Sequence, residues 1–173
     1  MASAIHPSRV AVKRGLSYYG THLDTIVPYS VGFILCAAFT ALAMSRMQRD
    51  TLHVRRLRAF LIVFLTLLVA ILFTPYSVDL VFDWLHIGLS AFLFGVTIIA
   101  GTWLALCVVG GLVGHGLLGA QVAGGGLSLA AQLGALDYMI PSQFLFQTAF
   151  SILLVRALQH MPGLNPVARA TRH

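Results

Sequence analysis

The chain of 173 residues is 58% hydrophobic and 9% charged, and its mean hydropathy is +0.88. A chain this apolar does not fold as an ordinary soluble domain, so we expect an integral membrane protein. The net charge of +6 comes from basic residues at the ends of apolar runs, where they orient a protein against anionic lipid. This placement argues against a nucleic-acid partner. The two cysteines, Cys36 and Cys107, lie within apolar runs, which argues against a disulfide framework.

The first 25 residues form a mixed segment that contains Arg9, Lys13 and Arg14 but no apolar stretch. A secretory signal needs an apolar core directly after its basic start. We therefore expect the chain to be unprocessed and this segment to be polar or to lie at the membrane interface.

Five apolar runs follow, each close to the roughly 20 residues that a helix needs to cross a bilayer. They cover residues 26–45, 59–77, 84–109, 111–136 and 139–158. The predicted fold is therefore all-α, a polytopic membrane helix bundle with five transmembrane helices over residues 26–158. Residues 159–173 contain two prolines and little apolar surface, so we expect a flexible cytoplasmic tail.

The charged residues predict which side of the membrane each end faces. The connector 46–58 is rich in arginine, and Arg156, Arg169 and Arg172 stand at the end of the fifth run and beyond it. Four spans separate these two segments, so both lie on one side. The positive-inside rule makes that side cytoplasmic and places the N-terminus outside, most simply in a bacterial plasma membrane. The connector also suits a lipid-head-group site, although topology alone explains its arginines.

Aspartate and tyrosine gather at the predicted outer edge of the bundle. Such residues are ordinary in loops, but tyrosine also favours membrane interfaces because its ring is apolar and its hydroxyl is hydrated. The residues at this edge are Tyr18, Tyr19, Tyr29, Tyr76 and Tyr138, with Asp24, Asp79, Asp83 and Asp137.

His86, just inside the third run, is the first candidate for a polar site at this outer mouth. Helical spacing places Ser90 on its face, and Asp79 and Asp83 join that face if the helix begins early. Ionisable residues within a span usually face the bundle interior. The candidate catalytic or ligand residues are His86, Asp83, Asp79, His22 and Asp24, and the other ligand-contacting candidates at this edge are Ser90, Tyr18, Tyr76 and Tyr138.

His86 has three possible roles. It can form a structural hydrogen bond, contact a lipid or another ligand, or act in catalysis or metal binding. No HxxxH or HExxH spacing occurs, so the sequence predicts no metal site.

The fourth run carries a stripe of small residues, Gly116, Ala120, Gly124 and Ser128. Their four-residue spacing lets helix backbones approach closely in lipid. We therefore expect a neighbouring helix to pack there, and the same stripe offers a contact for a second copy or a partner membrane protein.

Amide side chains lie within the fourth and fifth runs. Gln121 and Gln132 lie on one side of the fourth helix, and Gln143 and Gln147 belong to the fifth. Amides paired across two helices satisfy each other without water. The alternative is a ligand-binding polar groove or a narrow path for transport. The glycine run 124–126 lowers helix propensity, which leaves open a broken helix that lines a cavity.

Familiar catalytic motifs do not occur in this sequence. His115 lies near the inner end of the fourth run, in the opposite leaflet from His86, so the two are not placed to hold one haem. Lys13 precedes every span, which excludes a retinal Schiff base within the bundle. P-loop, GxSxG and CxxC patterns are lacking, and no cofactor is predicted.

The order "SYYGT", a short spacer and "PYSVGF" ahead of a small-residue helix resembles bacterial relatives of the FRAG/DRAM/Sfk-type multispanning membrane proteins. The resemblance covers residues 16–109 and includes a histidine near the outer end of a later span, here His86. Such families typically have six spans, whereas the span before "SYYGT" is missing here. The resemblance implies a lipid-associated or regulatory membrane protein, without catalytic residues to carry over.

Three functions follow as expectations. The first is a non-catalytic integral membrane protein that binds lipid or a partner membrane protein. The second is a membrane-embedded hydrolase or transferase acting on a lipid head group, with His86 as acid or base, assisted by Asp83 or Asp79, and His22 or Asp24 as second group. The third is a small transporter whose path follows Gln121, Gln132, Gln143 and Gln147.

Overall fold

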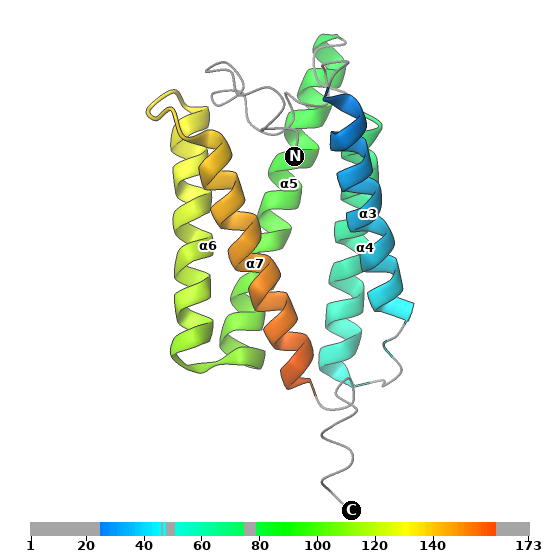
Figure 1. Cartoon of the computed structure of the whole chain (residues 1–173), viewed down its shortest axis with the longest axis vertical. Coiled ribbons are helices and arrows are strands. Elements are labelled where there is room, and N and C mark those ends of the chain that lie inside the picture. Colours follow the sequence, from blue (N-terminus) through cyan, green and yellow to red (C-terminus); the bar gives the residue numbers. More distant parts are fainter. Residues whose placement is uncertain (1–24, 46, 48–50, 75–78, 162–173) are drawn as a thin grey trace, which may run out of the picture.

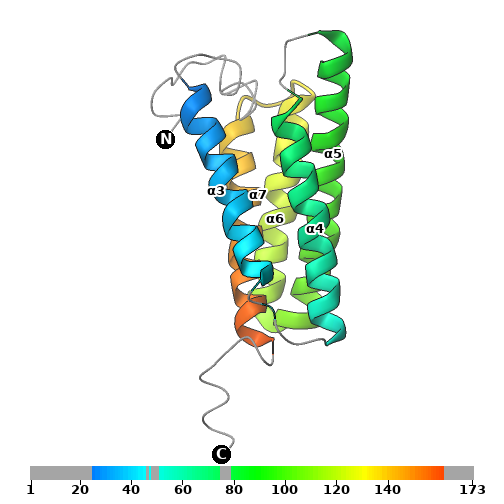
Figure 2. The ribbon, with the colours of Figure 1, turned by 90° about the vertical axis from the view of Figure 1, so that its right-hand side faces the viewer.

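The computed structural model describes residues 25–45, 47, 51–74 and 79–161. Within these residues the fold is all-α, as predicted, and contains no strand. The helices lie side by side and run alternately in opposite directions (Figures 1 and 2). Their bounds are Ile26–Ser45 for α3, Leu52–Leu72 for α4, Leu80–Trp103 for α5, Gly111–Gln132 for α6 and Met139–His160 for α7, and a π-helical segment η2, Leu104–Val109, continues α5.

Two of the described segments, α3 and the continuous stretch Leu80–Val109, are long and apolar enough to cross a membrane. The composition of the other three helices is more polar. Arginines occupy the first two turns of α4, while glycine and glutamine lower the apolar content of α6 and α7. By length and composition alone, two of the described segments could therefore span a membrane.

Local hydrogen bonds explain where the helices depart from the predicted runs. The helix α4 begins at Leu52, ahead of the predicted residue 59, because the Thr51 side chain caps it by accepting from the Val54 N–H at 3.4 Å. The helix α6 ends at Gln132, ahead of residue 136. Gly134 there adopts a φ of 81°, and Ala135 N–H donates to the Ala130 carbonyl oxygen at 2.9 Å, a glycine-terminated helix end.

The glycine run of α6 does not break the helix, because α6 is continuous from Gly111 to Gln132. The sequence left open whether this helix is interrupted, and the structure shows one continuous helix. The turn that precedes α6 does require glycine, since Gly110 and Gly111 have φ values of 64° and 59°.

A buried apolar cluster joins α4, η2 and α7. Leu57 of α4, Leu104 of η2 and Leu153 of α7 are each 0% exposed within it. In contrast, α3 has no buried residue and packs against α4 at the edge of the bundle. The helix α7 also packs along α6, so α7 lies between α6 and α4 (Figure 1).

Candidate functional site

The described charged residues are separated between the two ends of the bundle. One end, called the acidic end, carries Asp79 and Asp83 at the start of α5 and Asp137 between α6 and α7. The other, called the basic end, carries the described arginines near the start of α4 and the end of α7: Arg55, Arg56, Arg58 and Arg156. The alternating helix directions bring these segments together at each end (Figure 1).

His86 lies at the acidic end and is buried, with 5% of its surface exposed. Its Nδ1 atom lies 2.6 Å from the backbone oxygen of Thr74, just past the end of α4. A carbonyl oxygen can only accept, so Nδ1 carries the proton. His86 therefore joins the end of α4 to the first turns of α5, and Thr74 is a partner that the sequence pattern did not reveal.

Asp79 precedes α5 and caps it. Its carboxylate oxygen accepts from the Phe82 N–H at 2.8 Å, which satisfies one of the free donors at a helix N-terminus. The helix begins at Leu80, so it includes Asp83, and Asp79 is the residue directly before it. The cap gives Asp79 a structural role at the position where an acid or base was considered.

The remaining members of the predicted outer site divide into two groups. Ser90 is half-buried one turn after His86, and Tyr138 at the start of α7 is 65% exposed. His22, Asp24, Tyr18 and Tyr76 lie outside the described residues, so the proposed pairing of two histidines with aspartate stays a prediction. Among the described residues no group of three or more His, Cys, Asp or Glu side chains is arranged to hold a metal ion.

Gln121 is the most deeply placed polar side chain of α6, with 0% exposure. Its Nε2 donates to the backbone oxygen of Thr97 on α5 at 3.1 Å. Its Oε1 is buried without a hydrogen-bond partner. A Cβ added to Gly101 on α5 would stand 2.1 Å from that oxygen, so this glycine makes the space in which the amide lies.

A pair of hydroxyl groups joins α6 to α7. Ser128 Oγ donates to Ser142 Oγ at 3.0 Å, and both residues are buried. The prediction that Gln121 pairs with an amide of the fifth helix is wrong, because its amide bonds to α5. Gln143 is half-buried, whereas Gln132 and Gln147 are exposed, so the four glutamines do not share one buried line through the bundle.

The small-residue stripe of α6 is partly used within the chain. A Cβ on Gly124 would stand 2.6 Å from the Phe146 nitrogen of α7, and Ser128 bonds to Ser142 of the same helix. Ala120 is half-buried, while the space around Gly116 is open to 4 Å. Gly116 is therefore open for the predicted partner contact, whereas Gly124 and Ser128 already contact α7 within the chain.

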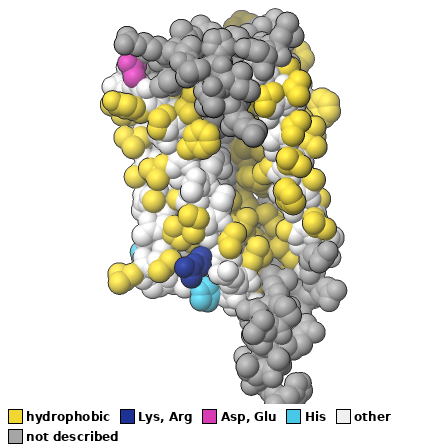
Figure 3. Space-filling view, viewed as in Figure 1, with side chains coloured by type: hydrophobic (Ala, Val, Ile, Leu, Met, Phe, Trp, Pro, Cys, Tyr) yellow, Lys and Arg dark blue, Asp and Glu magenta, His cyan; other side chains and the backbone are white. Residues whose placement is uncertain are grey.

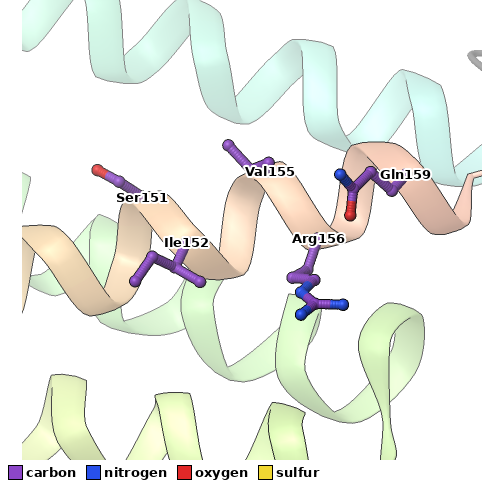
Figure 4. A pocket seen from close by; sticks show the side chains of 5 residues that line it. All are labelled: Ser151, Ile152, Val155, Arg156 and Gln159. Atoms are coloured by element: carbon purple, nitrogen blue, oxygen red, sulfur yellow. The ribbon is translucent and has the colours of Figure 1, made fainter.

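A hollow of about 440 Å³ lies along α7 toward the basic end. Its lining residues are Ser151, Ile152, Val155, Arg156 and Gln159 (Figure 4). All five are exposed, and their spacing places them on one side of the helix. The surface beside α7 is visibly hollowed in the space-filling view (Figure 3).

Comparison of the chain with protein-family models, with curated proteins and with solved structures gave no match. The resemblance to the FRAG/DRAM/Sfk-type proteins therefore stays a prediction from the residues that carry it.

Proposed function

We propose that the protein is a non-catalytic integral membrane protein whose five helices all cross the bilayer and whose surface facing the acyl chains binds phospholipid. The observation that carries this proposal is a belt of exposed apolar side chains between the acidic and the basic end. Large hydrophobic residues are exposed on each of the five helices, for example Phe39, Val69, Ile99, Val122 and Phe144.

Such a belt exceeds the scattered apolar exposure of a soluble monomer. In a bilayer the same side chains lie against acyl chains, while both charged ends reach water. The described bundle carries charge only at its two ends, and this arrangement suits a protein that crosses a bilayer.

Helix length supports five crossings. The helices α3, α4, α6 and α7 have 20, 21, 22 and 22 residues, close to the roughly 20 that span a hydrocarbon core. The arginines of α4 stand in its first two turns, where long side chains reach the interface. By the positive-inside rule the basic end is cytoplasmic and the acidic end, with the N-terminus, is outside, as in a bacterial plasma membrane.

Fractionation of cells that produce the full chain tests this function. The protein should remain in membranes washed with alkaline carbonate, and phospholipid should accompany it through purification in mild detergent. A mock purification from cells lacking the protein is the control for free lipid micelles. Release of the protein by carbonate, or phospholipid at the level of the mock sample, would contradict the proposal.

A further inference from the structure

The hollow along α7 changes in chemistry along its length. Ile152 and Val155 provide apolar surface on the side nearer the middle of the bundle, and Arg156 and Gln159 follow toward the basic end. In Figure 4 the Arg156 side chain extends away from the helix with its guanidinium at the free end. The other side of α7, including Leu153 and Ala157, is buried in the core cluster, so the hollow is a separate, outward-facing surface.

The described charged side chains at the end of the bundle that carries Arg156 are all basic. The described acidic residues, Asp79, Asp83 and Asp137, all stand at the opposite end of the bundle. Figure 3 shows a basic side chain and a histidine next to each other at the lower end of this face. An anion placed here would meet attraction from the guanidinium without repulsion from any of the described carboxylates.

The order of apolar and cationic groups matches an amphipathic anion. Arginine presents several N–H groups in a fixed plane that suits a phosphate. Gln159, almost one helical turn after Arg156, adds an amide donor. An acyl chain that points from the head group toward the middle of the bundle would run past Val155 and Ile152. A soluble anion would use Arg156 but not this apolar surface.

We propose that this hollow binds an anionic phospholipid from the leaflet at the basic end, with the phosphate on Arg156 and Gln159 and one acyl chain along Val155 and Ile152. This inference rests on the proposed function, because it requires the bundle to lie in a bilayer. A zwitterionic lipid brings a second, positive group close to Arg156, and so binds more weakly.

The test is native mass spectrometry of the full chain, purified in detergent and stripped of lipid. Phosphatidylglycerol and phosphatidylcholine with identical acyl chains are titrated separately. The unmodified protein should retain phosphatidylglycerol about fivefold more strongly than phosphatidylcholine. This factor corresponds to the attraction between one basic side chain and an anionic lipid surface. Arg156→Gln should abolish that preference. Arg56→Gln, which removes an exposed cation at the same end but on α4, should keep it.

A second variant separates the hollow from charge alone. Val155→Trp fills the apolar part while Arg156 stays, and it should weaken retention of both lipids. Equal retention of the two lipids by the unmodified protein, or equal effects of Arg156→Gln and Arg56→Gln, would overturn the site and leave the proposed function standing. Release of the unmodified protein from carbonate-washed membranes would instead overturn the proposed function itself.

Discussion

Gly124 on α6 and Phe146 on α7 lie so close that a Cβ atom on the glycine would stand 2.6 Å from the Phe146 backbone nitrogen. The same Cβ would stand 2.9 Å from the backbone oxygen of Ser142. Both neighbours are helix backbone, which cannot turn aside as a flexible side chain can. The missing side chain at Gly124 therefore sets the distance between the two helices.

Gly124→Ala should lower the free energy of unfolding by about 1–3 kcal/mol, because the helices must move apart to admit the methyl group. The matched control is Gly126→Ala on the same helix, where an added Cβ meets nothing within 4 Å. The control should leave stability unchanged or raise it, since alanine favours a helix over glycine. Thermal unfolding of both variants in one detergent provides the measurement, and equal losses would contradict close packing at Gly124.

Gly101 and Gln121 should be energetically coupled across α5 and α6. Gly101→Ala displaces the Gln121 amide from its bond to Thr97, with an expected loss of about 1–2 kcal/mol. In a Gln121→Ala background the same methyl group enters vacated space and should cost less. A double-mutant cycle on thermal or denaturant unfolding should give a coupling of about 1 kcal/mol. Strict additivity of the two substitutions would show that the contact has no energetic effect.

Asp79 should act as a helix cap rather than as an acid or base. Asp79→Ala should destabilise the protein by about 1 kcal/mol, the usual effect of losing an N-cap side chain. Asp79→Ser supplies a hydroxyl oxygen that can accept from the Phe82 N–H in place of the carboxylate oxygen, and should restore most of that loss. If Ser destabilises the fold as much as Ala does, the carboxylate has a role that capping does not explain.

His86 should stabilise the acidic end through its bond to Thr74. His86→Ala leaves the Thr74 carbonyl oxygen without this donor and opens space, so we expect a loss of about 1–3 kcal/mol. His86→Asn keeps a side-chain N–H near the position of Nδ1 and should lose less. Unfolding midpoints compare the two variants, and the reverse order would argue against the hydrogen bond as the source of stability.

Much of the helical architecture could be predicted from the sequence, because apolar runs of span length are a strong signal. The run 26–45 coincides with α3. The first turns of α4 could not be predicted in this way, because arginines mark the end of an apolar run. The helix nevertheless begins at Leu52 with Thr51 as its cap, and Val54 and Leu57 are buried next to those arginines.

The contacts between helices could not be predicted in the same way. The sequence singled out the glutamines, but it could not show which face of α6 meets which neighbour. Gln121 turns to α5 because Gly101 leaves space there, and the serine pair Ser128–Ser142 joins α6 to α7. These partners depend on helix rotation, which spacing within one helix does not determine.

The central claim, a bundle that crosses the membrane with its acidic end outside, is tested most directly by thiol labelling in whole cells. Cys36 and Cys107 are replaced by alanine, and single cysteines are placed at the exposed positions Leu80 and Asp137 of the acidic end and Leu52 of the basic end. A membrane-impermeant reagent should label Leu80→Cys and Asp137→Cys in intact cells, and Leu52→Cys only after permeabilisation. Equal labelling of all three, or protection of Asp137→Cys while Leu80→Cys reacts, would contradict the proposed topology.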